Sequence, residues 1–239
     1  MNRTFTLVGR GRAGGSIAIA LEAVGWQLVR TYGRADDPTD AAADVDLCVI
    51  ATPDALIADV AGSIRPAEAV VLHLSGVTGL DALGAHRAGA LHPLVALPEE
   101  IAGAEALRTA WFAVGGDPIA RDLAEQLSGR WFPIADDDRT LYHAAAVVAS
   151  NHLVALLGHL ERIAAEIDVP VEAFLRLAQG SLDDVARLGS ADALTGPARR
   201  GDEATLDAHR RALAERLPAE LAAYDALLAE ARRLADPAD

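Results

Sequence analysis

The sequence predicts an α/β protein in two parts: a Rossmann-type parallel sheet domain over residues 1–134, and an all-α domain built on one long helix over residues 135–239. Two observations predict this fold. As far as residue 134, short apolar runs alternate with helical patterns, which is typical of βαβ units. After Ala135 no stretch alternates as a strand does, and the chain from Asp138 to Asp168 contains no turn signal.

Seven apolar stretches predict the strands of a parallel sheet that helices cover on both faces. Asp46–Thr52 (DLCVIAT) is apolar on both sides, as a central parallel strand is. The other expected strands span residues 3–9, 26–32, 69–74, 88–91, 111–114 and 130–134. Helices are expected over 12–25, 54–64 and 117–128, with Asp54 as the cap of the second and Asp117 before Pro118 at the start of the third.

The long helix opens the second part. Its first half, LYHAAAVVASNHLVALL, is apolar nearly all round, which predicts a helix buried along its length. Val169 and Pro170 end it. Further helices are expected at about 171–188, 202–216 and 218–235, with Asp202 as a cap and a loop from Thr195 to Asp202 before it.

Composition excludes several classes of partner. The net charge of −14 repels phosphate backbones and anionic lipid, so we expect neither nucleic acid nor membrane surfaces as partners, and no apolar run approaches a membrane span. The single cysteine, Cys48, and an N-terminus without an apolar signal core predict a cytoplasmic protein. All 21 basic residues are arginine, so lysine chemistry is excluded.

A glycine motif stands between the first predicted strand and the first predicted helix. It reads Gly9-Arg10-Gly11-Arg12-Ala13-Gly14, the spacing G-x-G-x-x-G in the context that binds a dinucleotide. Gly9 permits the tight turn, Gly11 lets the backbone approach a diphosphate, and Gly14 lets helix and strand pack closely. Free N–H groups at the helix N-terminus face the phosphates, and Arg10 and Arg12 add positive charge. We expect all six residues at the cofactor.

The residues after the second predicted strand bear on the choice between NADP and NAD. NAD enzymes place an acidic residue there, about 20 positions after the motif, to bind the ribose 2′-OH. Here the chain has Gly33 and Arg34, and an arginine suits a 2′-phosphate. Asp36 and Asp37 are the alternative if the strand runs longer. We expect NADP in preference to NAD, with Gly33, Arg34, Thr52 and Pro53 at the cofactor.

Polar side chains follow two other predicted strands. His73 and Ser75 come at the end of one, and His92 at the end of another. Ligands of open α/β sheets bind at this edge. We expect Ser75 at the cofactor and both histidines at the substrate; the alternative for each histidine is that it satisfies loop backbone.

The long helix carries a polar stripe. At about 100° per residue, His143, Ser150 and Asn151 fall on one side. Polar groups on a buried helix are costly unless they are hydrogen-bonded or face a cavity. His143 is the candidate proton donor, with Ser150 or Asn151 orienting a substrate carbonyl; the alternative is a structural histidine. In the loop after the helices, Thr195 and Arg200 are candidates for a substrate carboxylate, or else form an ordinary connection. No metal site is expected.

Several segments resemble known families. Asp46–Asp54 (DLCVIATPD) and the long helix resemble the 6-phosphogluconate dehydrogenase C-terminal-like superfamily, which includes ketopantoate, pyrroline-5-carboxylate and β-hydroxyacid reductases. Four further segments resemble bacterial Rossmann-like proteins with a C-terminal helical domain of unknown function. They are HLSG at 73–76, LHPL at 91–94, YHAAA at 142–146 with Ser150-Asn151, and LTGP at 194–197 with Arg200-Gly201-Asp202.

The resemblance implies an NADP-dependent reductase of a small 2-oxo acid or imine, with a ketopantoate-type acid as the expected substrate, and a homodimer. One departure bears on the mechanism. Many members of the superfamily carry a catalytic lysine about one turn before an asparagine on the long helix, whereas Val147 and Val148 precede Asn151 here. A non-catalytic NADP-binding sensor or regulatory protein is therefore the alternative.

Overall fold

The computed structural model describes residues 3–236, and the chain divides into two compact units, residues 1–150 and 151–239. The expected domain boundary, after residue 134, lies ahead of helix α5 (Arg139–Val147). The compact division falls after Ser150, so α5 belongs to the first unit.

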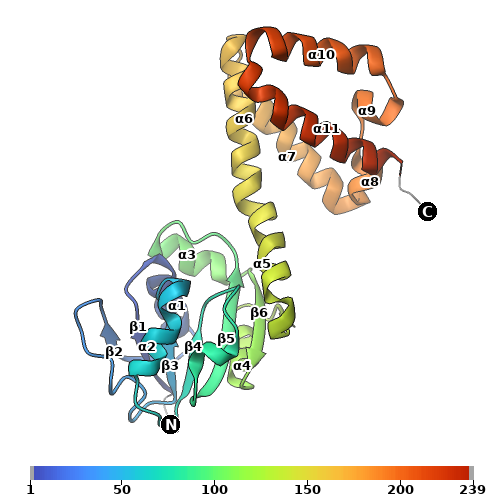
Figure 1. The fold of residues 1–239 in the computed structure, drawn as a ribbon. Helices are drawn as coiled ribbons and strands as arrows, with labels where there is room; N and C mark the ends of the chain where they lie inside the picture. The colour runs from blue at the N-terminus through green and yellow to red at the C-terminus, as the bar shows by residue number, and fades with distance from the viewer. Residues whose placement is uncertain (1–2, 237–239) are drawn as a thin grey trace. The chain divides into compact units, whose positions relative to one another are not determined.

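The first unit is a seven-stranded sheet with flanking helices, and the second is helical, so the fold class predicted from the sequence is confirmed (Figure 1). The strand order is β2-β1-β3-β4-β5-β6-β7. The strands are β1 (Thr4–Val8), β2 (Gln27–Tyr32), β3 (Leu47–Ile50), β4 (Val70–His73), β5 (Arg87–Leu94), β6 (Trp111–Gly116) and β7 (Trp131–Pro133). The helices of this unit are α1 (Arg12–Ala23), α2 (Ile57–Ser63), α3 (Glu100–Leu107), α4 (Ile119–Leu127) and α5, with short 3-10 turns η1 (Asp54–Leu56), η2 (Leu80–Leu83) and η3 (Asp136–Asp138).

The expectation of an entirely parallel sheet is wrong at one pair. β5 and β6 are antiparallel, with Leu94 opposite Trp111 and Gly89 opposite Gly116. The other neighbouring pairs are parallel. The physical reason is the connection: α3 packs against α1 instead of crossing over the two strands it joins. The chain therefore returns into the sheet from the edge at which β5 left it.

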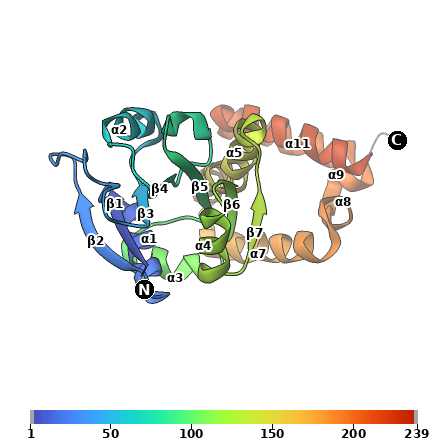
Figure 2. The same ribbon diagram turned by 90° about the horizontal axis from the view of Figure 1, so that it is seen from below.

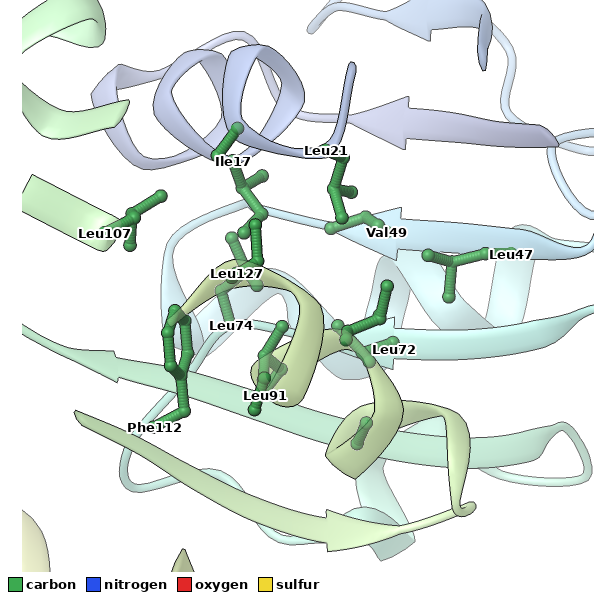
Figure 3. Packing of buried hydrophobic residues seen from close by; sticks show 14 of the residues in the cluster. Ile17, Leu21, Leu47, Val49, Leu72, Leu74, Leu91, Leu107, Phe112 and Leu127 are labelled. Atoms are coloured by element: carbon green, nitrogen blue, oxygen red, sulfur yellow. The ribbon is translucent and has the colours of Figure 1, made fainter. Parts of the chain in front are cut away.

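Helices cover both faces of the sheet, each over its own apolar core. On one face α1, α3 and α4 pack over residues such as Val49, Leu72 and Leu91 (Figures 2 and 3). On the other face α2 and η2 pack over Cys48, Ile50 and Val71. β3 and β4 are buried on both sides, which is why their sequences are continuous apolar runs.

Two predicted helix starts differ in detail. Asp54 begins the 3-10 turn η1, and no side-chain cap hydrogen bond forms there, so its role as a cap is wrong. Before α4, the Oδ1 of Asp117 accepts a hydrogen bond from the Ile119 N–H at 3.1 Å, and Pro118 is the residue that precedes the helix. In the second unit, Asp202 does cap α10, because its carboxylate accepts from the Thr205 N–H.

The long helix is neither regular nor buried, and both expectations are corrected here. After α5 a π-helical turn, η4 (Val148–His152), precedes α6 (Leu153–Glu166). A wider turn changes the angles between side chains, so the stripe calculated at 100° per residue does not apply through Ser150. Leu141 is 76% exposed and Val154 68% exposed. The apolar pattern predicted that other parts of the chain would pack against this helix. Within the described residues, these apolar side chains remain exposed to solvent.

The second unit consists of helices after α6. They are α7 (Val171–Leu188), α8 (Ser190–Ala193), α9 (Gly196–Arg200), α10 (Glu203–Arg216) and α11 (Leu221–Ala235), with a 3-10 turn η5 (Pro218–Glu220) before the last. The predicted loop from Thr195 to Asp202 contains the short helix α9. Buried Glu220 joins this unit together: its carboxylate accepts from the Arg162 Nε at 2.6 Å and lies 2.6 Å from the Nδ1 of His159.

By length and composition alone, the helical stretch Asp136–Glu166 could cross a membrane, with a mean hydropathy of 1.4 over its most apolar window. The sequence expectation that no apolar run reaches this length is therefore corrected. The same criterion is met by apolar helices of proteins that do not enter membranes, so the stretch is weak evidence for one.

Candidate nucleotide and substrate site

The glycine motif forms a tight loop from β1 into α1. Gly9 has a φ of +112°, and its N–H donates to the Tyr32 carbonyl at 2.9 Å. A Cβ at Gly9 would lie 2.6 Å from the Ala51 carbonyl oxygen, and one at Gly14 would overlap the Gly9 carbonyl oxygen. Both positions therefore require glycine, because the loop, β3 and α1 touch backbone to backbone.

Gly11 differs from its two partners because it has room. It is the N-cap of α1, no side chain caps the helix there, and a Cβ would meet nothing within 4 Å. The first turn of α1 thus presents backbone N–H groups into open space, together with the positive end of the helix dipole. That is the arrangement that a diphosphate requires, and the glycine cradle fits the dinucleotide predicted from the sequence.

A cavity of about 560 Å³ adjoins this loop at the carboxyl ends of β1, β2 and β3. Apolar groups supply most of its wall, including Pro38, Leu56 and Val60. Seven of the predicted cofactor residues line it, together with Asp36: Gly9, Arg10, Gly11, Gly33, Arg34, Thr52 and Pro53. Its size and place suit the adenosine half of a dinucleotide.

Arginine and aspartate both face this cavity beyond β2. Arg34 is exposed and lines the wall, and the Arg10 Cδ lies 3.6 Å from the position of a Cβ on Gly33. The Asp36 Oδ2 accepts a hydrogen bond from the Gly33 N–H at 2.7 Å. β2 ends at Tyr32, so Asp36 is on the loop rather than the strand. The loop offers two guanidinium groups near one carboxylate that is already engaged.

The other predicted cofactor residues lie outside the cavity wall. Arg12 reaches across to the Pro98 carbonyl, at 3.5 Å, and Ala13 packs against the apolar core. Ser75 is buried, and its hydroxyl lies 2.8 Å from that of Thr78 while accepting from the Val77 and Thr78 N–H groups. Ser75 therefore holds its own loop together.

A cluster of rings lies where β5 ends. The Nδ1 of His92 lies 2.5 Å from the Tyr142 hydroxyl, and the rings of His92 and His143 are 6.4 Å apart. A Cβ on buried Gly76 would come within 3.0 Å of the His92 ring and 3.1 Å of His143. The structure therefore brings together His92 and His143, which the sequence placed on different elements, and adds Tyr142.

Burial sets the proton affinities of this cluster. It lowers the pKa of His92 to about 4, and the neighbouring His143 lowers it further. It also raises the pKa of the Tyr142 hydroxyl to about 12. Near neutral pH, His92 is thus an uncharged imidazole and Tyr142 an uncharged phenol, joined by one short hydrogen bond.

His73, on β4, is fully buried on the same side of the sheet. Its Nδ1 accepts from the Ser75 N–H at 3.2 Å, and burial lowers its pKa to about 4. This is the backbone-satisfying alternative that the sequence left open. His73 is nonetheless linked to the ring cluster: it binds the backbone of Ser75, and the next residue, Gly76, lies against the rings of His92 and His143.

The remaining candidates are distributed differently. The Ser150 hydroxyl, on an exposed residue, donates to the Ala146 carbonyl at 3.0 Å. Asn151, Thr195 and Arg200 belong to the second unit, where all three are exposed. Thr195 lines an apolar cavity of about 550 Å³ between α6, α7, α10 and α11. Their role at the substrate stays a prediction. Among residues 3–236, no group of three or more histidine, cysteine or acidic side chains could hold a metal ion.

Fold and glycine cradle together define a Rossmann-like domain followed by a helical region. The chain belongs to the family described as domain of unknown function DUF2520, whose model matches residues 112–231. A search of curated proteins gives no match.

Solved structures resemble almost the whole chain. Protein TM1727 from Thermotoga maritima is 23% identical with a TM-score of 0.76, and 98% of each chain is covered. Protein BF3122 from Bacteroides fragilis, described as a "putative NADP oxidoreductase", is 22% identical with a TM-score of 0.77, covering 97% of this chain and 98% of that one. An imine reductase of Streptomyces aurantiacus is 15% identical with a TM-score of 0.66, covering 98% and 95%. At these identities the likeness establishes the fold.

Proposed function

We propose that the protein is an NADP-dependent reductase of a small imine or 2-oxo acid. The observation that carries the proposal is the juxtaposition, within one compact unit, of an open glycine cradle and the His92–Tyr142–His143 cluster. Both lie at the carboxyl ends of strands in the same sheet. A hydride donor bound over the cradle and a proton donor beyond it are the two parts that such a reduction needs.

NADP is the proposed cofactor. Gly9, Gly11 and Gly14 would hold the diphosphate at the N-terminus of α1, with Thr52 and Pro53 beside it and Arg34 and Arg10 at the 2′-phosphate. A guanidinium binds a phosphate dianion by paired, charge-assisted hydrogen bonds. When bound, the nicotinamide supplies a hydride. The NADP oxidoreductase description of the Bacteroides fragilis protein supports this choice.

His143 is the proposed proton donor. It lies beside the uncharged His92–Tyr142 pair, and an imidazole within reach of the reacting group is the commonest general acid in enzymes. Lysine cannot serve, because the chain has none. Ser150 and Asn151 are proposed to orient the substrate, and His73 and His92 to contact it or its surroundings.

The substrate class follows from the charge of the candidate ligands. Arg200 and Thr195 are proposed to hold a carboxylate, which a 2-oxo acid or an imino acid carries. The imine reductase among the similar structures supports an imine. Ketopantoate remains the single 2-oxo acid we propose, on the resemblance to the 6-phosphogluconate dehydrogenase-like superfamily.

A homodimer in the cytoplasm completes the proposal. The apolar residues exposed along α5 and α6 favour a second copy as their cover. The missing lysine favours a second candidate function, a non-catalytic NADP-binding sensor.

One experiment separates the two functions. NADPH oxidation is followed at 340 nm with a panel of cyclic imines and 2-oxo acids, and binding of NADP+ and NAD+ is measured by calorimetry on the same protein. Turnover of at least one panel member supports the reductase. Tight NADP+ binding with no oxidation by any member favours the sensor, and the absence of nucleotide binding would contradict both.

A further inference from the structure

Arg139, the first residue of α5, is a buried cation whose guanidinium group makes only one hydrogen bond to the described residues. Its side chain is 1% exposed. The Nε donates to the Asp136 Oδ1 at 2.7 Å, while neither Nη1 nor Nη2 has a hydrogen-bond partner among the described residues. Burying a guanidinium with one carboxylate partner is costly, and Asp136 is itself 40% exposed. A positive charge sealed in this way keeps a strong field in its surroundings.

The sheet register places this charge on the face that carries His73. A Cβ on Gly115 would lie 2.7 Å from the Arg139 Nη2. Gly115 is opposite Ala90, and Ala90 is opposite His73, so these three residues form one row across β6, β5 and β4. Residues in one row point to the same face of a sheet. His92, two residues beyond Ala90 on β5, points to that face as well.

His73 has to be uncharged for the loop after β4 to keep its shape. A backbone N–H can only donate, so the bond from the Ser75 N–H requires that the Nδ1 of His73 carries no proton. A charged imidazole would lose that bond. Ser75 in turn leads into Gly76, against which the rings of His92 and His143 pack.

Charges of both signs face the two histidines. Burial is the main cause of the lowered pKa of His73; Arg139 lowers it further, while Asp136, Asp54 and the Gly79 backbone oppose this. For His92, burial again comes first. The neighbouring groups that lower its pKa further are His143, Arg139 and His73, and Asp54 opposes them. Arg139 is the group common to both that does not titrate.

We propose that Arg139 is a positioning residue whose sealed positive charge adds to burial and so extends, toward acid pH, the range in which His73 stays neutral and keeps the loop that places Gly76 against the ring cluster. The proposal deepens the reductase function, on which it rests for its meaning in catalysis. It leaves His143 as the proposed proton donor to the substrate.

The decisive measurement is an NMR titration of ¹⁵N-labelled imidazoles in the full-length protein. In the parent protein we expect His73 and His92 to stay neutral down to a pH of about 4. Arg139→Gln keeps a donor for Asp136 and removes the charge. Both midpoints should then rise by about one unit, the lower end of the shift that a nearby charge causes. Arg121→Gln, an exposed arginine on α4, is the matched control and should change neither.

Arg139→Lys distinguishes an effect of the positive charge from an effect of the shape of the guanidinium group. It keeps the positive charge without the planar fork, so both midpoints should stay near the parent values. If Arg139→Gln does not fold, this variant decides alone: midpoints that rise at constant charge would overturn the proposal. In a folded Arg139→Gln protein, unchanged midpoints would do the same.

Turnover gives a second readout that a structural role alone would not move. With any substrate found by the panel, the acid limb of the pH profile should shift upward in Arg139→Gln together with the His73 midpoint. The titration needs no substrate, so failure of the reductase proposal would leave this test intact.

Discussion

The Nδ1 of His92 and the hydroxyl of Tyr142 lie 2.5 Å apart, although 50 positions separate them in the chain. One comes from β5 and the other from α5. Since the pKa of His92 is lowered to about 4 and that of Tyr142 raised to about 12, both groups are uncharged over the whole physiological range and are joined by one hydrogen bond. Its state is fixed by burial rather than by pH.

Tyr142→Phe removes this hydrogen bond while keeping the ring that packs on Phe132. We expect turnover to fall by about tenfold, the equivalent of one hydrogen bond of about 1.4 kcal/mol, with NADP affinity unchanged. Steady-state kinetics and calorimetry measure the two quantities. A loss of cofactor affinity equal to the loss of turnover would show that Tyr142 supports the fold instead.

Gly11→Val places a side chain in the open space over the first turn of α1. The free protein should keep its fold, because nothing lies within 4 Å of the new Cβ. Nucleotide affinity should fall by about ten- to a hundredfold, since the side chain occupies the place of the diphosphate. Gly180→Val, at an equally open position on α7, is the control. Equal affinity of parent and Gly11→Val would remove the cradle as the nucleotide site.

Arg34→Glu reverses the charge at the proposed 2′-phosphate site. NADP affinity should fall by roughly ten- to a hundredfold and NAD affinity much less, because only NADP carries the phosphate. Arg30→Glu makes the same change in net charge on β2, where Arg30 lies over the Tyr32 ring and outside the cavity. Calorimetry with both nucleotides decides: losses of the same size for NADP and NAD would exclude a phosphate contact by Arg34.

His143→Ala removes the proposed proton donor. We expect turnover to drop by roughly a hundredfold or more, as general acids contribute, while NADP binding stays as it was. His152→Ala, at an exposed histidine of the second unit, is the matched control. Parent-like turnover in His143→Ala would return this residue to a structural role.

Acid should destabilise the protein through His73. Its pKa in the folded state, about 4, lies below the unfolded value near 6.5, so the unfolded chain binds the additional proton between these values. The stability that His73 contributes is therefore complete above pH 6.5 and is lost as the pH falls toward 4, by roughly 3 kcal/mol. Urea unfolding at a series of pH values measures this. The slope should flatten in His73→Gln, and an equal slope in both proteins would contradict the prediction.

The sequence predicted the fold well where a structural element depends only on residues that are contiguous in the chain. β1, the glycine loop and α1 follow from one strand pattern, the glycine motif and one helical stretch, all contiguous. The direction of β6 was not predictable in the same way, because a strand's pattern is the same read in either direction. Helix α3 was missed: Glu99 caps it, but its eight residues contain Gly103, which is unfavourable inside a helix and whose lack of a side chain allows close packing on Ser16.

The candidate site was predictable in its parts and not in its assembly. His92 and His143 follow from their positions on a strand end and a polar helix face. Their shared contact with Gly76 depends on the path of the loop after β4, which no spacing encodes. Tyr142 and Arg139 were missed as functional candidates, since a tyrosine and an arginine near a helix start are ordinary surface residues in sequence. The π-helical turn from Val148 to His152 carries no sequence signal of its own.

The antiparallel direction of β6 determines where helix α5, which carries Tyr142 and His143, begins. Because β6 and β7 run against β4, the residue after β7 is level with Val114, near the row of His73, and the chain turns there into α5. From there α5 runs toward the carboxyl end of β5. Arg139, at its start, therefore lies against Gly115 of β6, and Tyr142, further along, reaches His92 of β5. Had β6 and β7 run parallel to β4, the chain would have left β7 at the carboxyl end of the sheet, and α5 would have begun beyond the level of His73 instead of near it.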